Sequence, residues 1–259
     1  MSKDVIKMKK FNFLFLLVLC AVFFSSCGIQ KVSNETEEKI TPPKSISEWD
    51  AILKQNQMTV GINRTEFAEL FVEALGKESG LQLEVIEYAS FEDAKKAVEN
   101  KEVQMYVGNF PKESRDTIDF SVSSPYLKST SDIIALSEDY KPDKDNDTAG
   151  VIRESTEMFL VDNYFNNYVV YDNIHQLFSA LVNKKISCAF IDTLLFEKSG
   201  YSKNEYFVFD TYPYSLVAVY NQKSTEVARE MEVWIAKLKA SGEADDISEK
   251  CFGENLIFK

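Results

Sequence analysis

The sequence predicts an α/β protein of two lobes that are joined by two crossover segments. Strand-like and helix-like patterns alternate along the chain, and such alternation is typical of parallel sheets covered by helices on both faces. The alternating series occurs twice, and two β-rich segments connect the two series. The 214 residues from 46 to 259 are enough for two lobes of about 100 residues each.

The first series has the order βαβαβ. The segment "QMTVGI" alternates like a strand, and residues 67–75 place apolar side chains at helical spacing, with Gly76 as the predicted C-terminal stop. The second strand, "LQLEVIEY", leads to a helix that Ser90 and Asp93 open as a capping box. The third strand is "VQMYVG". The loops at the carboxyl ends of such parallel strands form the natural ligand crevice.

The second series repeats this scheme. It contains the strand "AGVI", a helix from Thr156 to Phe165, the strand "YVVY", a helix opened by Asn173 and Gln176, and the strand "ISCAFI". The segments "SDIIALSED" and "SLVAVYNQK" are the two predicted crossings between the lobes. An amphipathic helix over residues 225–241 follows the second crossing.

The first 45 residues are predicted to lie outside the fold. Lys7, Lys9 and Lys10 precede the apolar run from Phe11 to Phe24, and this order predicts a signal peptide over residues 1–26. The run is shorter than the roughly 18 to 20 residues that cross a bilayer as a helix. The run ends in "FSSC", which resembles the lipobox of bacterial lipoproteins, and this resemblance implies acylation (palmitate) at Cys27. The alternative is ordinary cleavage beside an incidental thiol. Residues 27–45 are polar and aperiodic, so they predict a tether to the membrane.

Charge and composition exclude several classes of function. The formal net charge is −12, and it becomes −15 without residues 1–26, so a nucleic-acid partner is not expected and the anchor depends on acyl chains. One histidine, His175, and four cysteines cannot supply a histidine-rich or zinc site, although a carboxylate-only metal site stays open. We expect Cys188 and Cys251 to be unpaired core thiols rather than a disulfide, and we expect a monomer.

Three segments resemble one known family. The stretches "PKESRDTIDFSVSSPY", "ALVNKKISCAFIDTLLFEKSG" and "LKASGEADDISEKCFGEN" are similar to the family 3 extracellular solute-binding proteins, the amino-acid-binding receptors of ABC importers. The resemblance implies a type II periplasmic binding protein fold, with lobe 1 formed by residues 46–136 plus 213–259 and lobe 2 by residues 137–212. It also implies an ABC permease as partner and a location in the periplasm or at the cell surface.

The resemblance implies two charged ligand contacts. Arg115 lies in the segment similar to the carboxylate-binding arginine motif, and a guanidinium can clamp a carboxylate bidentately. The register is one residue short, so Ser114 is an alternative, and Arg115 could instead pair on the surface with a nearby acid. Asp192 ends a buried strand and matches the acid that binds the ligand ammonium, or it caps the next helix. We expect Arg115 and Asp192 to face each other across the gap between the lobes.

Other positions at the predicted crevice complete the site. Ser155 and Thr156 open a helix whose N–H groups favour a carboxylate, but Glu154 replaces the glycine usual in the family, so capping by Ser155 is an alternative. A shortened first loop leaves Arg64, with its neighbours in residues 63–66, at the edge of the site. The remaining expected contacts follow the third strand: Asn109 and Phe110, with Phe110 and Tyr126 as aromatic cover unless they belong to the core.

Three functions are compatible with these residues. The first is a lipid-anchored receptor that captures an amino acid or similar small polar solute by lobe closure, without catalysis or a cofactor. The second is a sensory or regulatory lipoprotein whose divergent cleft binds a peptidoglycan fragment, peptide or protein. The third, an enzyme on the same scaffold, would need a positioned acid, for which Glu66 and Glu154 are the only hints.

Overall fold

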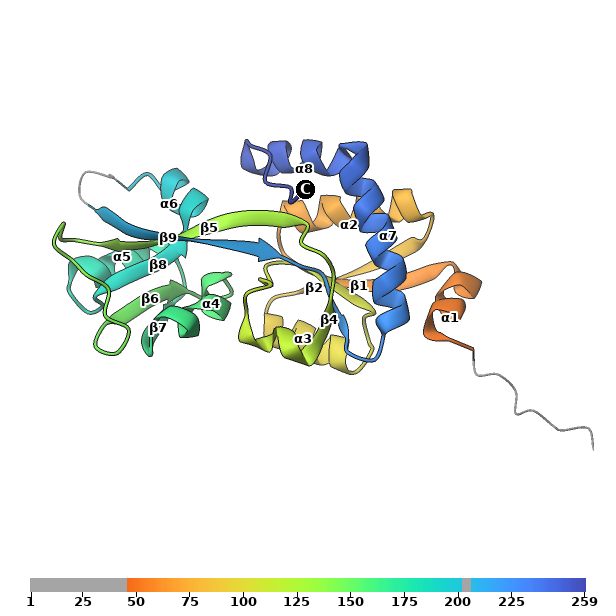
Figure 1. The fold of residues 1–259 in the computed structure, drawn as a ribbon, viewed down its shortest axis with the longest axis horizontal. Coiled ribbons are helices and arrows are strands. Elements are labelled where there is room, and N and C mark those ends of the chain that lie inside the picture. The colour runs from red at the N-terminus through yellow and green to blue at the C-terminus, as the bar shows by residue number, and fades with distance from the viewer. Residues whose placement is uncertain (1–45, 202–205) are drawn as a thin grey trace, which may run out of the picture. The chain divides into compact units, whose positions relative to one another are not determined.

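The computed structural model describes residues 46–201 and 206–259, which form one compact unit. The expected signal peptide, the tether and Cys27 lie outside the described residues. The described part of the chain contains two sheets of five strands each. Figure 1 shows the two groups of strands and helices. We call each sheet with its helices a lobe, numbered by order along the chain.

The first lobe consists of eleven elements. They are α1 (Glu48–Gln55), β1 (Gln57–Asn63), α2 (Glu66–Ser79), β2 (Gln82–Tyr88), α3 (Phe91–Glu99), β3 (Met105–Val107), the 3-10 helix η1 (Arg115–Asp119), β4 (Phe120–Val122), β10 (Val219–Asn221), α7 (Thr225–Ser241) and α8 (Glu243–Phe252). The strand order is β2-β1-β3-β10-β4. The first three strands are parallel, as the βαβαβ pattern predicts, and β10 is antiparallel to both of its neighbours.

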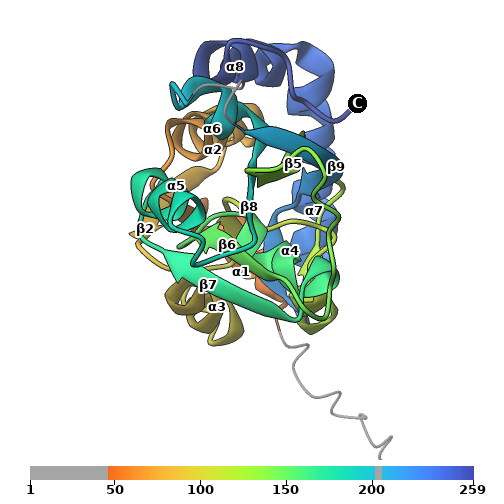
Figure 2. The same ribbon diagram turned by 90° about the vertical axis from the view of Figure 1, so that its left-hand side faces the viewer.

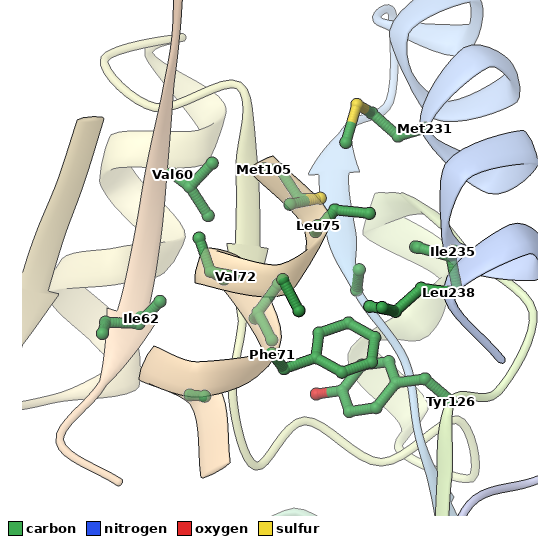
Figure 3. Packing of buried hydrophobic residues seen from close by; sticks show 14 of the residues in the cluster. Val60, Ile62, Phe71, Val72, Leu75, Met105, Tyr126, Met231, Ile235 and Leu238 are labelled. Atoms are coloured by element: carbon green, nitrogen blue, oxygen red, sulfur yellow. The ribbon is translucent and has the colours of Figure 1, made fainter. Parts of the chain in front are cut away.

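Alternation along the strands divides the core of the first lobe into two layers. Met58, Val60 and Ile62 lie on one face, and they pack with residues of α1, α2, α7 and α8. Figure 3 shows this cluster, in which the ring centroids of Phe71 and Tyr126 are 4.9 Å apart. Tyr106 faces the other side, where it packs with α3. The central strands β1, β3 and β10 are therefore buried on both faces, whereas the edge strand β2 is largely exposed. In the central strands, polar chemistry is left to the strand ends.

The second lobe is built in the same way. Its elements are β5 (Leu127–Ala135), β6 (Thr148–Ile152), α4 (Glu157–Tyr164), β7 (Asn167–Tyr171), α5 (Ile174–Val182), β8 (Cys188–Asp192), α6 (Thr193–Lys198) and β9 (Phe207–Leu216). The strand order is β7-β6-β8-β5-β9, and β7, β6 and β8 are parallel. Cys188 and Phe190 pack with α4, whereas Ala189 and Ile191 pack with α5. Figure 2 shows α4 and α5 on opposite sides of this sheet.

The two strands that connect the lobes, β5 and β9, form one antiparallel pair. The first predicted crossing overlaps β5, but the second was placed too late in the chain, because only Ser215 and Leu216 of it belong to β9 and residues 219–221 form β10. β5 pairs with β9 along its whole length and with β8 on its other side, so both crossing strands belong to the second sheet. This arrangement differs from the expected lobe boundaries, which placed residues 127–136 and 213–216 in lobe 1. The chain leaves β9 at Leu216 and enters the first sheet as β10 three residues later.

The predicted stop at Gly76 is wrong. Helix α2 continues to Ser79 and ends at Gly80, which has φ 73°, and the Gly80 N–H donates to the Gly76 carbonyl at 2.9 Å. Gly80 rather than Gly76 therefore supplies the left-handed residue that ends the helix. The predicted N-cap of α3 is confirmed, because Ser90 Oγ accepts from the Asp93 N–H at 3.2 Å. Asp93 Oδ2 in turn accepts from the Ser90 hydroxyl at 2.9 Å.

Cys188 is buried and Cys251 is half-buried, and both are free, as expected. Burial raises the pKa of the Cys188 thiol to about 12, so this thiol is unreactive at neutral pH. Within residues 46–201 and 206–259, no helix combines the length and apolar character needed to span a membrane.

Replacing Gly76 and Gly80 in turn by alanine tests which of the two glycines ends α2. Gly80→Ala should lower the free energy of unfolding by about 1 kcal/mol, because alanine is strained at positive φ. Gly76→Ala should raise it by up to about 1 kcal/mol, because Gly76 is helical and an added Cβ would lie 3.4 Å from Leu83 Cγ, an ordinary contact. Urea unfolding curves measure both, and equal effects of the two variants would contradict this assignment.

Candidate functional site

The candidate site lies at the carboxyl end of β8. Asp192 ends this strand, and its Oδ1 accepts from the Leu195 N–H at 2.9 Å, which caps α6. Its Oδ2 accepts from the Ser129 hydroxyl at 2.9 Å and from the Tyr214 hydroxyl at 2.8 Å. Both crossing strands thus contribute a donor. The capping alternative is confirmed, and the carboxylate remains partly exposed at the position expected for an ammonium contact.

Glu157 is a second acid near Asp192, and the sequence pattern did not indicate it as a site residue. Its side chain is only 1% exposed, and Glu157 Oε1 accepts from the Ser131 hydroxyl at 2.6 Å. The pKa of the Glu157 carboxyl is raised to about 7, chiefly by burial and in part by the nearby Asp192 charge, against the lowering effect of hydrogen bonds such as that from Ser131. An acid in the first turn of a helix is ordinarily solvated, so only its burial distinguishes this residue.

Glu157 should make the stability of the protein depend on pH. Its folded pKa of about 7 lies above the ordinary value of 4.5, so its stabilising contribution is present below pH 4.5 and is lost as the pH rises through 7. The loss amounts to about 3 kcal/mol. Glu157→Gln should remove this loss, and it should be the more stable protein at pH 8.

Thermal unfolding of the wild type and of Glu157→Gln between pH 5 and pH 8 measures this difference. Glu78→Gln is the matched control, because Glu78 is an exposed acid on α2. The pH dependence of the control should match that of the wild type. If Glu157→Gln also follows the wild-type curve, Glu157 does not titrate in this range.

Arg115 does not face Asp192 in this structure. It is exposed on η1, where its Nε donates to Asn163 Oδ1 at 3.0 Å and its Nη2 donates to the Asp162 carbonyl at 2.7 Å. Arg115 therefore binds the C-terminal turn of α4, where the helix dipole favours a cation. Asp192 lies near Glu157 at the other end of the same helix. Five to six residues of helix separate the two ends by roughly 8 Å.

A second group of contacts joins the lobes at the start of α4. The Phe91 N–H donates to Glu154 Oε2 at 2.9 Å, and Asn109 Nδ2 donates to the Glu154 carbonyl. The Thr156 hydroxyl donates to the Asn109 carbonyl at 3.2 Å. Asn109 and Thr156, both expected ligand contacts, therefore bind each other here. The N-terminus of α3 thus binds a carboxylate of the protein itself, that of Glu154.

The remaining expected contacts lie in different surroundings. Phe110 and Tyr126 are fully buried in the core of the first lobe, so the core alternative is confirmed for both. Arg64 is exposed and pairs with Glu87 at 3.3 Å. Ser155 does not cap α4, whose N-cap residue is Thr156 and whose N-terminus has no side-chain cap hydrogen bond. The Ser155 hydroxyl is buried and lies close enough to the Glu157 carboxyl to lower its pKa.

Two hollows lie apart from these residues. One hollow, of about 440 Å³, is lined by residues that include Thr148, the first residue of β6, and Ser187, which precedes β8. Asp192 is the last residue of β8, so this hollow lies at the opposite edge of the second sheet. The other, of about 400 Å³, lies between α2 and β2. In the part of the chain that the structure describes, no three histidine, cysteine, aspartate or glutamate side chains come together as a possible metal site.

Two sheets linked by a pair of crossing strands, with polar residues gathered at the strand ends, define the type II periplasmic binding protein fold. The chain belongs to the bacterial extracellular solute-binding proteins, family 3, whose model matches residues 49–254. No curated protein matches the chain.

Solved structures confirm the fold at low sequence identity. An ABC uptake transporter substrate-binding protein from Streptococcus pneumoniae with bound histidine matches with a TM-score of 0.64 and 16% identity, over 83% of this chain and 100% of that one. The GluR0 ligand-binding core from Nostoc punctiforme with L-glutamate has a TM-score of 0.61 and 17% identity, over 75% and 99%. The ancestral amino-acid-binding protein AncCDT-1, a precursor of cyclohexadienyl dehydratase, has a TM-score of 0.59 and 16% identity, over 80% and 100%.

Proposed function

We propose that this chain is the receptor of an ABC importer and that it binds an amino acid or similar small polar solute between its lobes. Lobe closure is the whole of its action, and no bond of the solute is made or broken. The observation that carries the proposal is the carboxylate of Asp192 at the carboxyl edge of the second sheet, held by donors from both crossing strands. A partly exposed carboxylate fixed in this way suits a ligand ammonium group.

The family membership and the fold support this proposal. Among the solved structures with the same fold, one contains histidine and one contains L-glutamate. The ammonium of such a ligand would bind Asp192, and the buried Glu157 would add negative charge when it ionises. Arg115 is the proposed carboxylate contact, and it would have to leave the end of α4 to make it.

The proposal includes export and a lipid anchor. The "FSSC" segment that ends at Cys27 supports acylation of this cysteine, and the polar residues after it would act as a tether. The net charge of −15 beyond residue 26 supports an anchor made of acyl chains, since an acidic protein is repelled by anionic lipid. The partner in the membrane would be the permease.

Loss of the cysteine tests the anchor. Cys27→Ala should move the protein from the membrane fraction to the soluble fraction of a bacterial host, because a tether without acyl chains has no stable hold on lipid. Fractionation and the mass of the N-terminal peptide measure this change. Cys188→Ala is the control and should stay with the membrane. An unmodified Cys27 in the wild type would contradict the proposed anchor.

Thermal unfolding with candidate solutes tests the receptor. A solute at about 100 times its dissociation constant adds about 2.7 kcal/mol to the stability, which raises the melting temperature by about 5 to 10 °C. Asp192→Asn should abolish the shift given by an amino acid. The unliganded melting temperature should change little, because asparagine also caps a helix.

Asp172→Asn is the matched control, because Asp172 is an exposed aspartate in an ion pair with Arg153. This control should keep the full shift. The screen covers the twenty amino acids, small peptides and muropeptides. The absence of any shift with an amino acid would overturn the amino-acid receptor, and a shift retained by Asp192→Asn would overturn the role of Asp192.

One observation favours the second function, a sensory or regulatory lipoprotein that binds a peptidoglycan fragment, peptide or protein. Two groups expected to contact a ligand bind the protein's own residues instead: Arg115 binds the end of α4, and Asn109 binds the Glu154 carbonyl. A cleft closed in this way suits a partner that binds the outside of the closed lobes. In the same screen, a shift with muropeptides or peptides alone would favour this function.

A further inference from the structure

Glu154 joins the two lobes through both its side chain and its backbone. Its carboxylate accepts a hydrogen bond from the N–H of Phe91, the first residue of α3 in the first lobe. Its carbonyl accepts from the side chain of Asn109, which follows β3 in the same lobe. One residue of the second lobe therefore contacts the first lobe at two separate elements.

The α3 N-terminus is a favourable place for this carboxylate. Ser90 already satisfies the Asp93 N–H, whereas the Phe91 N–H takes its acceptor from Glu154. A hydrogen bond to a carboxylate is stronger than one to a neutral acceptor, and the helix dipole adds to it. The first turn of α3 also holds Glu92 and Asp93, whose charges oppose another anion, so the contact depends on the direct hydrogen bond.

The backbone of Glu154 is held in an unfavourable conformation. Its φ is 57°, in the left-handed region that side chains with a Cβ rarely adopt. Such a conformation persists where surrounding contacts determine it, and the two contacts to the first lobe do so here. A glycine would adopt this conformation without strain, so the glutamate is explained by what its side chain binds.

An aromatic contact lies beside these hydrogen bonds. Phe159 on α4 of the second lobe packs against two rings of the first lobe, with ring centroids 4.8 Å from Phe91 and 5.6 Å from Phe110. Phe91 therefore makes both kinds of contact with the second lobe: its N–H donates to Glu154, and its ring packs against Phe159.

We propose that Glu154 is a built-in latch, whose carboxylate binds the α3 N-terminus and holds the two lobes together in the absence of any solute. In the latch, the carboxylate of Glu154 occupies the Phe91 N–H, which would otherwise be free to bind an anionic group of a solute. A solute that enters between the lobes has to compete with it, so the latch sets the fraction of molecules that are open to a ligand. This inference goes beyond the proposed function, and it concerns the protein without ligand.

Hydrogen exchange of the full chain, measured by mass spectrometry without added solute, tests the latch. Glu154→Gly removes the carboxylate and relieves the backbone at the same time. Peptides that span residues 88–95 should exchange about 10-fold faster or more, because the Phe91 N–H loses its charged acceptor. Glu154→Gln keeps an acceptor of the same length without the charge, so its increase should be smaller.

Two controls separate a latch from a general loss of structure. Arg153→Ala changes the preceding residue, which forms an exposed ion pair with Asp172 within the second lobe, and it should leave residues 88–95 unchanged. Asn109→Ala removes the contact to the Glu154 carbonyl, together with a 3.4 Å hydrogen bond from the Tyr106 hydroxyl within the first lobe. It should also speed exchange, which keeps the test available if Glu154→Gly unfolds. Unchanged exchange in both Glu154→Gly and Asn109→Ala would overturn the latch. An equal increase in β1 and β8 would overturn it as well, because it would show global loosening.

Discussion

The arrangement of polar residues in this protein depends on the burial of both faces of the central parallel strands of each sheet. Helices cover the first sheet with α2 and α7 on one face and α3 on the other, and they cover the second with α4 and α5. In the central strands β1, β3, β6 and β8, alternate residues belong to two apolar layers, so the polar groups of these strands lie at strand ends and helix starts. Asp192, Glu154 and Asn109 all lie at such positions.

Electrostatics at these positions differ between the two lobes. In the second lobe, the acids Asp192 and Glu157 lie near each other, and burial raises the pKa of Glu157 to about 7, so this carboxyl exchanges its proton near neutral pH. In the first lobe, the N-terminus of α3 meets the carboxylate of Glu154. The acids Asp192 and Glu157 thus lack a neighbouring positive charge in the contacts described above, whereas the N-terminus of α3 already binds an anion, the carboxylate of Glu154. A cationic group on a ligand would therefore gain more from this site than an anionic one.

The family assignment and the contacts between the lobes concern different questions. The family model and the solved structures establish the fold, and several of those structures contain a bound amino acid. Fold alone does not determine what a site binds, because function resides in specific side chains. Here Arg115 of the first lobe binds α4 and Glu154 of the second lobe binds α3. Both contacts join the two lobes, so the lobes are not separated by an open cleft at these positions.

The sequence determined the elements of this protein, because strands, helices and caps depend on residues close together in the chain. Period-two and helical patterns predicted both alternating series, and the Ser90 cap of α3 is formed by residues three apart. Gly76 was mistaken for a helix end because a glycine in the interior of a helix looks the same in sequence. Only the tertiary structure decided the partners of Arg115 and Glu154, which lie 48 and 63 residues away, and the burial of Glu157. Those contacts depend on how the folded layers meet, which local preferences do not specify.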